Sequence, residues 1–459
     1  MIDNLRVLIL AAGKSTRMKS KYAKVLHRAG GATLIDHVLR AARSVSTDIT
    51  IVIGHSADKV REHLPESRFV EQKEQLGTGH AVISAHDVFK GYSGNLLILP
   101  GDVPLVSAKT LEALAKFHAD GGYSSSILTT DLWNPHGYGR IVRKTDDEVE
   151  SIIEHRDATP EVLKIREINS SIYVFDAASL FEALAKVDTN NAQGEFYLTD
   201  AIGILVKNRK KIGAFKIENS EEVLGINTRQ ELAAVDHVMR RKKCEALMTN
   251  GVTIIDPAST FIDVDVHIGP DTIIHPSVQI QSQTFIGEDV TIHSFSRITN
   301  SKIGPKSVVL DGCVIVDSTL GEQVSVGPYA HLRMNTALAD TVKVGNFVEI
   351  KKSSLGSGTK SMHLAYLGDA TIGKDVNVGA GTITCNYDGF QKHPTVIEDG
   401  AFIGTDSQLI APVRIGKNAY VAAGSSITDD VPPDSLAIAR GRQAVKEGWV
   451  KERKKRRQQ

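Results

Sequence analysis

The feature that most constrains the fold is a short repeat in the second half of the chain. Aliphatic-glycine pairs recur between Ile268-Gly269 and Ile415-Gly416, and several of their intervals are multiples of six residues or within one of that. A hexapeptide period is typical of a solenoid with triangular coils, one hexad forming each side. We expect the aliphatic residue to point into the coil and the glycine to serve its tight corner. The repeat therefore predicts a left-handed parallel β-helix over residues 251–459.

The first half of the chain has a different pattern, in which short apolar runs alternate with helical periodicity. Strands are predicted over residues 49–53, 95–99, 125–128 and 171–175, and helices over residues 34–44, 79–89 and 108–119. This alternation is typical of an α/β fold with a mostly parallel, Rossmann-like sheet, whose ligand lies at the carboxyl ends of the strands. We therefore predict a separate domain over residues 1–227.

A helix is predicted between the two halves. Thr228 and Glu231 have the spacing of a capping box, which marks a helix start. Apolar residues continue at helical spacing, and Gly251 supplies a stop signal. A linker helix over residues 228–250 would be roughly 33 Å long, which is enough to separate two domains.

The stretch from Val7 to Lys24 carries the first functional signal. Its apolar strand is followed by Ala11, Ala12 and Gly13, whose small side chains let another group approach the backbone closely. The cations of the same segment are Lys14, Arg17, Lys19, Lys21 and Lys24. Backbone N–H groups and cations together favour a phosphate-binding loop.

Several interpretations of this loop compete. Gly13-Lys14-Ser15-Thr16 has the end of a P-loop, but the other glycine of that motif would fall on Leu8, inside the strand. A dinucleotide fingerprint is absent from the sequence. The stretch from Leu10 to Met18, with Lys24, is similar to the signature of sugar-1-phosphate nucleotidyltransferases, which we favour. The last alternative is an ordinary turn with a solvated basic face.

Asp102 is a candidate metal ligand, because it follows Pro100 and Gly101 at the end of an apolar strand. Mg²⁺ prefers one or two protein oxygens together with phosphate and water, which an acid beside a phosphate loop would provide. The alternative is an aspartate in an ordinary turn. The preceding strand favours the metal.

Other polar clusters should converge on the same edge of the sheet. The side chains between Gln72 and Thr78 offer donors and acceptors that suit a nucleobase edge. The alternative is a helix start capped by Thr78, and both can hold at once. The turn at Gly139 and the polar residues Glu154 and Asn169 suit sugar hydroxyls.

The first half resembles the uridylyltransferase domain of the bacterial bifunctional enzymes that make UDP-N-acetylglucosamine. The matching motifs are L-A-A-G at 10–13, K-V-L-H at 24–27, E-Q-L-G-T-G-H-A at 74–81, G-D-V-P at 101–104, G-Y-G-R-I at 137–141, E-H-x-D-A-T at 154–159 and N-A-Q-G-E-x-Y-x-T-D at 191–200. The resemblance implies a Mg²⁺ site at Asp102 and Asn227. The implied nucleotide and sugar contacts are Leu10, Ala11, Ala12, Gly13, Gln72, Gly77, Thr78, Pro100, Gly101, Gly139, Glu154 and Asn169.

The implied reaction of this half is attack by the phosphate oxygen of N-acetylglucosamine-1-phosphate on the α-phosphorus of UTP, with loss of pyrophosphate. The nucleophile is already an anion, so no general base is needed. Arg17 and Lys24 would act with the metal to neutralise charge.

Catalysis in the second half rests on an interruption of the repeat, because a solenoid alone is not an activity. Gly381 to Gly389 is predicted to be a loop inserted between hexads, able to reach a neighbouring prism. A single prism would leave this loop without a facing surface, so we predict a homotrimer. His363 would then face Arg333 and Lys351.

The coils over residues 345–369 and the block over residues 377–389 resemble the acetyltransferase half of the same enzymes. The motifs are G-N-F-V-E-I-K-K, H-L-x-Y-L-G-D and N-x-G-A-G-T-I-T-C-N-Y-D-G. The implied reaction is acetyl transfer from acetyl-CoA to the amine of glucosamine-1-phosphate, and its product is the sugar substrate of the first half. Together the two steps would supply UDP-N-acetylglucosamine for peptidoglycan and lipopolysaccharide precursors.

The resemblance also implies roles for individual residues of this half. His363 would accept the proton of the sugar ammonium, since an imidazole is neutral over part of the physiological pH range. The implied sugar-phosphate contacts are Arg333, Lys351, Tyr366 and Asn377. The implied acetyl-CoA contacts are Ala380, Asn386, Tyr387, Thr405, Ala423 and Arg440.

Several positions depart from the family pattern. They are Ser15 for glycine, Ala23 for proline, Pro100 for an aromatic or small polar residue, Ser170-Ser171 for Thr-Gly, Met334-Asn335 for Pro-Gly and Thr405 for serine. We expect these departures to affect loop geometry and rate more than reaction type.

Composition limits the partners and the compartment. The 459 residues carry a formal net charge of zero, which favours neither nucleic acid nor a membrane surface. No apolar run approaches the roughly 20 residues of a membrane span, and the N-terminus does not read as a signal peptide. Three widely spaced cysteines fit a reduced cytoplasmic protein. The basic run from Lys451 to Arg457 is predicted to be a solvated, disordered tail.

Two alternatives to a bifunctional enzyme remain. In the first, the β-helix is a regulatory scaffold of a nucleotidyltransferase, as in ADP-glucose pyrophosphorylases, and His363 with the block over residues 377–389 argues against it. In the second, the protein is a sugar-nucleotide-binding scaffold without catalysis. Asp102, Asn227 and His363 argue against that interpretation.

Overall fold

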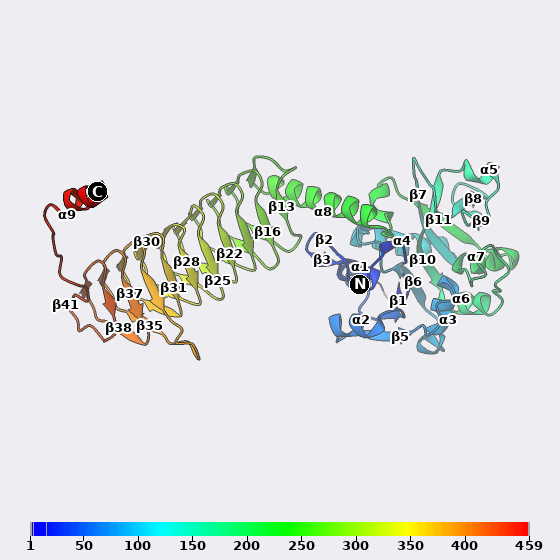
Figure 1. The fold of residues 1–459 in the computed structure, drawn as a ribbon. Helices are drawn as coiled ribbons and strands as arrows, with labels where there is room; N and C mark the ends of the chain where they lie inside the picture. Colours follow the sequence, from blue (N-terminus) through cyan, green and yellow to red (C-terminus); the bar gives the residue numbers. More distant parts are fainter. Residues whose placement is uncertain (1, 3, 15, 458–459) are drawn as a thin grey trace. The chain divides into compact units, whose positions relative to one another are not determined.

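The chain folds into two compact units, covering residues 1–239 and 240–459. The computed structural model in Figure 1 describes residue 2, residues 4–14 and residues 16–457. The boundary between the units falls inside helix α8 (Arg229–Thr249), which agrees within a residue at each end with the predicted linker helix. The division into residues 1–227, 228–250 and 251–459 remains a prediction.

The first unit is an α/β domain built on one mixed sheet. Its strands are β1 (Leu5–Ala11), β4 (Ile49–Ile53), β5 (Arg68–Glu71), β6 (Asn95–Pro100), β7 (Ser125–Asp131), β8 (Arg140–Arg143), β9 (Val149–Ile153), β10 (Glu167–Asp176) and β11 (Ile212–Lys216). Its helices are α1 (Leu34–Val45), α2 (Ala57–His63), α3 (Thr78–Ser84), α4 (Ala108–Gly121), α5 (Pro160–Leu163), α6 (Ala177–Leu184) and α7 (Leu198–Lys207). A small hairpin pairs β2 (Arg28–Ala29) with β3 (Ala32–Thr33).

The main sheet has the strand order β11-β7-β10-β6-β1-β4-β5, with β8 and β9 attached at β10. The neighbours β6, β1, β4 and β5 are parallel, whereas β10 is antiparallel to both β6 and β7. The predicted α/β, Rossmann-like sheet is therefore confirmed, but it is mixed rather than mostly parallel, because β10 and β8 pair only antiparallel with their neighbours. The predicted helix over residues 79–89 is divided into α3 and a 3₁₀ turn over His86–Phe89.

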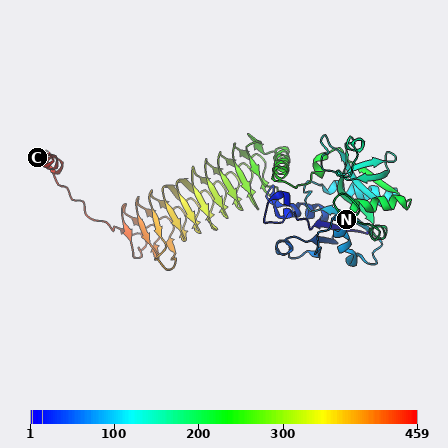
Figure 2. The same cartoon turned by 45° about the vertical axis from the view of Figure 1, so that its right-hand side comes forward.

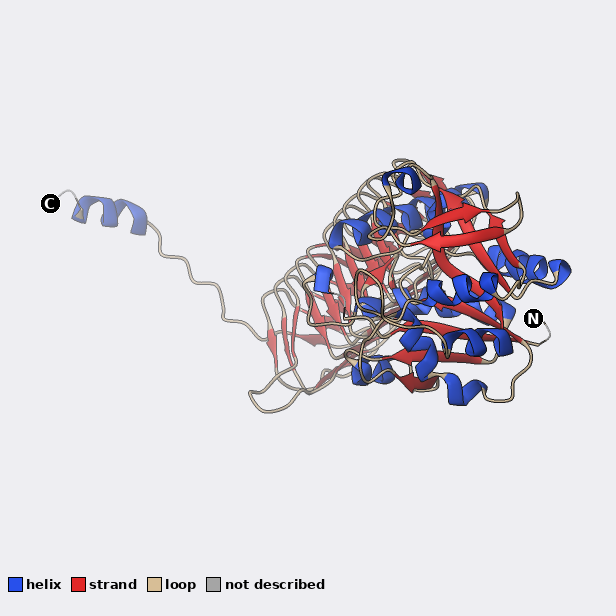
Figure 3. Cartoon of the chain, turned by 90° about the vertical axis from the view of Figure 1, so that its right-hand side faces the viewer, coloured by secondary structure: helices blue, strands red, loops and turns tan. Residues whose placement is uncertain are grey.

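Strand β1 is buried on both faces, as its continuous apolar run predicts. Val7 and Ile9 belong to one hydrophobic cluster, and Leu8 belongs to another on the opposite face of the sheet. Figure 3 shows the strands of this unit in red with its helices in blue around them. The sheet core therefore leaves only its strand ends for a ligand.

Helix α8 begins at the predicted capping box. The Thr228 hydroxyl accepts a bond of 3.2 Å from the Glu231 N–H, and the Glu231 carboxylate accepts one of 2.8 Å from the Thr228 N–H. The helix ends where Gly251 takes a φ of +90°, which glycine adopts without strain. The C-terminal half of α8 packs on the second unit, because Cys244 and Leu247 belong to the core of the coils.

The second unit is a left-handed parallel β-helix with three sheet faces, whose coils are stacked in Figure 2. The first face contains β12 (Thr253–Ile254), β15 (Ile273–Ile274), β18 (Thr291–Ile292), β21 (Val308–Val309), β24 (Ser325–Val326), β27 (Lys343–Asn346), β30 (Lys360–His363), β33 (Asn377–Val378), β36 (Phe402–Ile403), β39 (Tyr420–Val421) and β41 (Leu436–Ala437). The second contains β13 (Phe261–Ile262), β16 (Gln279–Gln281), β19 (Arg297–Thr299), β22 (Val314–Val316), β25 (His331–Arg333), β28 (Glu349–Lys351), β31 (Tyr366–Gly368), β34 (Ile383–Cys385), β37 (Gln408–Ile410) and β40 (Ser426–Ile427).

The third face closes the triangle. It contains β14 (His267–Ile268), β17 (Phe285–Ile286), β20 (Lys302–Ile303), β23 (Thr319–Leu320), β26 (Ala337–Leu338), β29 (Ser354–Leu355), β32 (Ala370–Ile372), β35 (Thr395–Ile397) and β38 (Val413–Ile415). Aliphatic residues of the repeat fill the interior, as predicted, with Ile286, Ile303 and Ile403 at most 1% exposed. The chain continues to a short helix, α9 (Trp449–Arg456). Its side chains are exposed, as predicted for a solvated tail, but the prediction of disorder is wrong.

The expected role of the repeat glycines is wrong. The left-handed corners are mostly held by other residues, such as Phe295 with a φ of +62° and Asp375 with a φ of +54°. Gly327 is the exception among the aliphatic-glycine pairs, with a φ of +106°. The other glycines of these pairs serve close coil packing: a Cβ on Gly269 would lie 2.7 Å from the Glu288 nitrogen, and one on Gly304 would overlap the Gly321 carbonyl. Each coil therefore rests directly on the backbone of the next.

The inserted loop begins later than predicted. Residues 383–385 form β34, which pairs in register with β31 and β37, so this part of the expected loop belongs to a regular coil. The extra residues lie between β34 and β35, over residues 386–394, where a bridge joins Tyr387 to Lys392. None of the helices that the structure describes is long and apolar enough to cross a membrane.

Candidate functional sites

The first candidate site lies at the carboxyl ends of the parallel strands, where the sheet topology predicts it. The Gly101 N–H donates to the Leu10 carbonyl at 2.9 Å, and the His55 N–H donates to the Ala12 carbonyl at 3.4 Å. Gly13 is exposed, and a Cβ there would have nothing within 4 Å. The loop from Leu10 to Gly13 thus leaves open space beside Gly13, and the predicted charge-neutralising Arg17 is exposed.

Lys24 joins the two predicted metal ligands. Its ammonium forms an ion pair with the Asp102 carboxylate and donates to the Asn227 amide oxygen at 3.0 Å. The two oxygens, from segments far apart in the sequence, therefore point at a common cationic group. Two hard oxygen donors fit a divalent cation that completes its coordination with phosphate and water. Within the described residues there is no cluster of three His, Cys, Asp or Glu side chains able to hold a metal.

Asn227 is held in place by the start of α8. The Glu231 carboxylate accepts a bond of 2.6 Å from the Asn227 N–H in addition to its bond from Thr228. The preceding residue, Ile226, donates its N–H to the Asp102 carbonyl at 3.1 Å. The capping box therefore also positions a candidate metal ligand, a role that its sequence spacing does not reveal.

The predicted uracil contacts form a fixed loop. Gln72 is 3% exposed, and its amide nitrogen donates to the Gly77 carbonyl at 3.1 Å. Gly77 has a φ of +112°, and a Cβ there would lie 2.5 Å from the Phe196 carbonyl. Thr78 does not cap α3, whose N-cap is Gly77; its hydroxyl instead accepts from the Leu198 N–H at 3.2 Å. The alternative of Thr78 as a cap is therefore wrong.

The three predicted sugar contacts lie together on one side of the β8–β10 extension. A Cβ on Gly139 would lie 3.4 Å from a Glu154 carboxylate oxygen and 3.5 Å from the Asn169 Cβ. The Glu154 carboxylate accepts from the Thr199 hydroxyl at 3.1 Å. Burial, to which the charges of nearby aspartates add, raises the pKa of Glu154 despite that hydrogen bond. Hydrogen-bonding groups for a polar ligand are thus gathered in a poorly solvated place.

The departures in this unit are compatible with the backbone. Ala23 has φ −56° and ψ 138°, a conformation that proline also adopts. Pro100 ends β6. The Gly101 N–H faces β1, so a backbone N–H at position 100 would face β10. The pairing of β10 with β6 has already ended there, at Tyr173. Ser171, in place of glycine, has a strained φ of +63°. Ser15 lies outside the described residues.

The second candidate site lies on the β-helix, where His363 ends β30. Its Nδ1 nitrogen is 2.9 Å from the amide oxygen of Asn346, its partner on β27 in the preceding coil. An amide oxygen can only accept, so Nδ1 carries the proton and Nε2 keeps a lone pair. The exposed ring is therefore oriented to accept a proton at Nε2.

The predicted acetyl-CoA contacts continue the His363 position along the coil axis. Asn377 pairs with Lys360 and Phe402, which places Ala380 between His363 and Thr405 in the stack. Ala423 follows in the next coil, where the Gly424 N–H donates to the Thr405 carbonyl at 2.8 Å. The Arg440 guanidinium donates to the Ala423 carbonyl at 2.9 Å. Small side chains and a terminal cation thus form one row.

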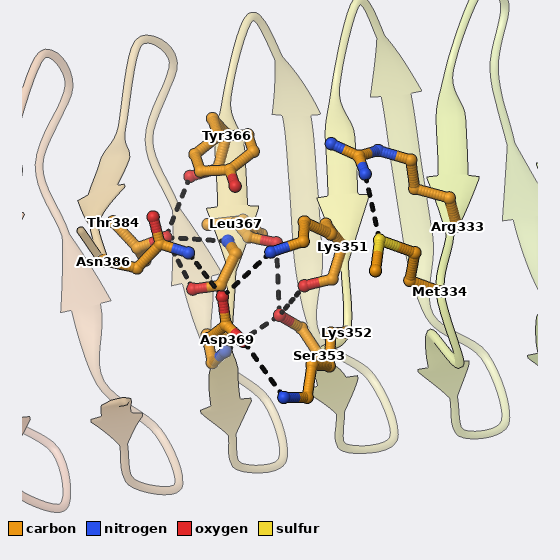
Figure 4. A network of polar contacts seen from close by, with 12 residues as sticks. Arg333, Met334, Lys351, Lys352, Ser353, Tyr366, Leu367, Asp369, Thr384 and Asn386 are labelled. Carbon is orange, nitrogen blue, oxygen red and sulfur yellow. Dashed lines mark hydrogen bonds and ion pairs between the residues drawn. The ribbon is translucent and has the colours of Figure 1, made fainter. Parts of the chain in front are cut away.

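Three of the predicted sugar-phosphate contacts, Arg333, Lys351 and Tyr366, lie on the second face, as Figure 4 shows. Arg333 pairs with the Glu349 carboxylate at 2.7 Å, and Lys351 in the next coil pairs with Asp369 at 3.2 Å. A Cβ on Gly368 would overlap the Tyr366 hydroxyl and lie 2.8 Å from the Asn386 amide nitrogen. This glycine therefore allows Tyr366 and Asn386 to approach each other.

Not every predicted residue of this half joins that cluster. Asn377 is exposed on the first face, and Tyr387 is 60% exposed on the inserted segment, with its hydroxyl donating to the Gly389 carbonyl at 2.7 Å. Asn386, assigned by resemblance to acetyl-CoA, is 7% exposed and bonded within the sugar-phosphate cluster. Within a single chain, the predicted contacts therefore form two separate groups, one on the first face and one on the second.

The Met334-Asn335 departure changes a corner next to Arg333. Both residues have positive φ angles, +55° and +62°, which proline at the first position could not adopt. The Met334 sulfur lies 3.1 Å from an Arg333 guanidinium nitrogen. The corner therefore differs from any Pro-Gly turn and adds a soft acceptor beside the predicted phosphate contact.

Several residues of these sites were missed by the sequence analysis. They are Glu231, Asn346, Glu349, Asp369 and Lys392. Glu349 and Asp369 lie within the quoted motifs, so a coil-by-coil alignment of hexads would have placed them beside Arg333 and Lys351. Lys392 lies in the inserted segment, whose register no repeat specifies.

Family models match both units. The MobA-like NTP transferase domain matches residues 7–188, the GMPPB C-terminal domain matches residues 261–355, and the bacterial transferase hexapeptide (six repeats) matches residues 394–429. The match over residues 7–188 covers the strand ends that carry the first site. The two other matches cover coils on either side of His363.

Full-length relatives show the same pairing of domains. The bifunctional protein GlmU of Koribacter versatilis is 49% identical over 451 residues, covering 97% of this chain and 96% of that protein. The proteins of the same name from Streptococcus agalactiae and Listeria monocytogenes are each 48% identical, and each alignment covers at least 96% of this chain and 97% of the relative. The similarity therefore spans both candidate sites.

Proposed function

The chain belongs to the family of bifunctional GlmU proteins, and from this membership we propose that it makes UDP-N-acetylglucosamine in two consecutive transfers. The unit of residues 240–459 would move acetyl from acetyl-CoA to the amine of glucosamine-1-phosphate. The unit of residues 1–239 would then move uridylyl from UTP to N-acetylglucosamine-1-phosphate, releasing pyrophosphate. The observation that carries the proposal is the near-complete alignment, which includes both sites.

Uridylyl transfer needs positioning and charge neutralisation more than proton transfer, because the attacking phosphate oxygen is already an anion. A Mg²⁺ ion held by Asp102 and Asn227 would neutralise phosphate charge. Lys24 already lies between these oxygens, and Arg17 is exposed beside the loop, so both cations can face the phosphates. Glu154 and Asn169 would accept and donate hydrogen bonds to the sugar.

Acetyl transfer needs a base, because the sugar amine is protonated in neutral solution. Nε2 of His363 would take one proton from the ammonium, and the freed nitrogen would attack the thioester carbonyl carbon. His363 passes this first proton to solvent, and a C–N bond forms. Nε2 then accepts the second proton from the attacking nitrogen and gives it to the CoA sulfur as the C–S bond breaks, which leaves the amide and neutral HS-CoA. The Asn346 contact supports this role because it directs Nε2 outward.

The remaining contacts of the second site follow from charge. Arg333 and Lys351 would hold the sugar phosphate by charge-assisted hydrogen bonds. Tyr366, Asn377 and Asn386 would orient the sugar and the acetyl group. The proposed acetyl-CoA contacts are Ala380, Asn386, Tyr387, Thr405, Ala423 and Arg440.

We also propose a homotrimer in a reducing, cytoplasmic setting. The exposed side chains of His363 and Tyr387 support assembly, since each would gain a facing surface from a second prism. The free cysteines Cys244, Cys313 and Cys385 support a reducing compartment.

The direct test supplies the full-length protein with glucosamine-1-phosphate, acetyl-CoA, UTP and Mg²⁺. We expect UDP-N-acetylglucosamine and pyrophosphate, with N-acetylglucosamine-1-phosphate accumulating when UTP is left out. If uridylyl transfer to N-acetylglucosamine-1-phosphate occurs without any acetylation, the coils are a scaffold and the two-step proposal is wrong. The match of residues 261–355 to the GMPPB C-terminal domain is the observation that favours this second candidate, a nucleotidyltransferase whose coils are a scaffold.

A further inference from the structure

Asp369 lies at the centre of the polar network in Figure 4, although no expected role was assigned to it. It occupies the left-handed corner between β31 and β32, with a φ of +50° and a side chain 10% exposed. One carboxylate oxygen accepts from the Lys351 ammonium at 3.2 Å and from the Asn386 amide at 2.5 Å. The other oxygen lies 3.6 Å from the Lys352 ammonium.

The two short contacts of Asp369 involve residues from different coils. Lys351 comes from the preceding coil and Asn386 from the following one, and their side chains are nearly buried, at 4% and 7% exposure. Both are proposed substrate contacts. A carboxylate that bonds to both sets their separation and their direction, because neither side chain has room to adopt another rotamer freely.

Charge gives Asp369 a second effect on Lys351. A buried ammonium requires an opposite charge, and Lys351 also has two neighbouring lysines, Lys352 and Lys392. A hydrogen bond with Lys392 raises the pKa of Lys351, and the contact with Asp369 raises it further. Glu349 already pairs with Arg333, which leaves Asp369 as the carboxylate bonded to Lys351.

We propose that Asp369 is a positioning residue for acetyl transfer, holding the Lys351 ammonium and the Asn386 amide where the sugar phosphate binds. The inference rests on the proposed acetyl-transfer function. A role in stability alone is the weaker explanation, because a buried ion pair often contributes little net stability compared with apolar packing. The exposed contact with Lys352 contributes little to either role.

The test compares Asp369→Asn with Asp375→Asn in the full-length protein. Both aspartates occupy left-handed corners, with φ angles of +50° and +54°, and asparagine is well tolerated in that conformation. For Asp369→Asn we expect the KM for glucosamine-1-phosphate to rise about 10- to 100-fold, as for an outer-shell partner of a binding group. The uridylyl transfer rate should stay near wild type, and Asp375→Asn should match wild type throughout.

The pH profile separates positioning from a structural role. Without the Asp369 charge, Lys351 should lose its proton at a lower pH, because the contact with Asp369 raises the pKa of Lys351. The alkaline fall in kcat/KM for glucosamine-1-phosphate should therefore begin at lower pH in Asp369→Asn. Asp369→Glu keeps the charge but displaces the two partners, so its KM should rise while the alkaline fall stays at the wild-type pH.

The outcomes separate this inference from the proposed function. If wild type acetylates glucosamine-1-phosphate and Asp369→Asn keeps its KM and its alkaline profile, Asp369 does not position the site. If Asp369→Asn fails to fold, an unchanged KM in Asp369→Glu leads to the same conclusion. Failure of wild type to acetylate would instead overturn the proposed function.

Discussion

The Nδ1 nitrogen of His363 and the amide oxygen of Asn346 are 2.9 Å apart, although the two residues belong to successive coils. Their strands, β30 and β27, pair in register, so the contact depends on the length of one coil. Because the oxygen can only accept, this contact selects the imidazole tautomer whose Nε2 is free to accept a proton.

Removing the Asn346 oxygen should therefore impair acetyl transfer. In Asn346→Leu we expect kcat to fall about 10- to 100-fold, the cost expected for an outer-shell partner that orients a histidine. Asn346→Asp keeps an acceptor at the same place and should retain most activity. Steady-state rates of CoA release measure the effect, and equal loss in both variants would show that the contact does not orient the ring.

The two sites should fail independently. His363→Ala should abolish acetyl transfer and leave uridylyl transfer near normal, because it removes only the proposed base. Asp102→Ala should do the reverse, because it removes a proposed metal ligand beside Lys24. Separate assays with glucosamine-1-phosphate and N-acetylglucosamine-1-phosphate measure each step; parallel loss of both activities in a folded variant would contradict separate sites.

Acidification should weaken sugar binding at the first site. Burial and the charges of Asp157 and Asp200 raise the pKa of Glu154 above its ordinary value, although a hydrogen bond from Thr199 lowers it. Its ionised form is therefore present above this raised pKa and is lost as pH falls through it. On acidification, the KM for N-acetylglucosamine-1-phosphate should therefore begin to rise at a higher pH than the pH at which an ordinary carboxyl titrates.

Two substitutions check the assignment of that effect. Glu154→Gln cannot ionise, so its KM should be higher at neutral pH and nearly flat over the same range. Glu161→Gln changes an exposed acid in the same region and should follow the wild-type profile. A wild-type profile in Glu154→Gln would exclude Glu154 as the titrating group.

Because the coils pack closely, adding one methyl group between them should lower the free energy of unfolding. In Gly304→Ala the added Cβ would overlap the Gly321 carbonyl, so we expect the second unit to lose about 1–3 kcal/mol of unfolding free energy, as in other overpacked interiors. Gly441→Ala is the control, since a Cβ there has nothing within 4 Å. Thermal unfolding of both variants measures the difference, and equal midpoints would show that the coils can move apart.

Assembly should be visible in the solution mass. At assay concentrations we expect light scattering to give three times the chain mass of 49.7 kDa. A monomeric mass accompanied by full acetyltransferase activity would show that one prism suffices for the second site.

The fold was largely predictable because its signals are local. Each of these signals determines the structure of only a few neighbouring residues, as do the aliphatic residues of the repeat and the capping box at Thr228 and Glu231. The role of the repeat glycines was not predictable in this way. An aliphatic-glycine pair looks the same whether glycine supplies a positive φ or, as at Gly269, room for the next coil.

The site residues that escaped prediction are defined by neighbouring coils. Asp369 meets Lys351 and Asn386 only after the lengths of the coils on both sides are known. Asn346 meets His363 for the same reason. Glu231 was recognised as a helix cap, but its bond to Asn227 depends on the path of the chain before the helix.

The row from His363 through Ala380 and Thr405 to Ala423 has one residue in each successive coil, so the coils set the distances along it. Each coil advances the chain by about 4.8 Å, so the separation between the proposed base and Arg440 comes in whole coils and cannot be adjusted finely. Adding a coil inside this row would leave every local contact intact yet shift the terminal cation by one step. If acetyl-CoA binds along this row as proposed, a donor of that fixed length would then no longer reach both ends.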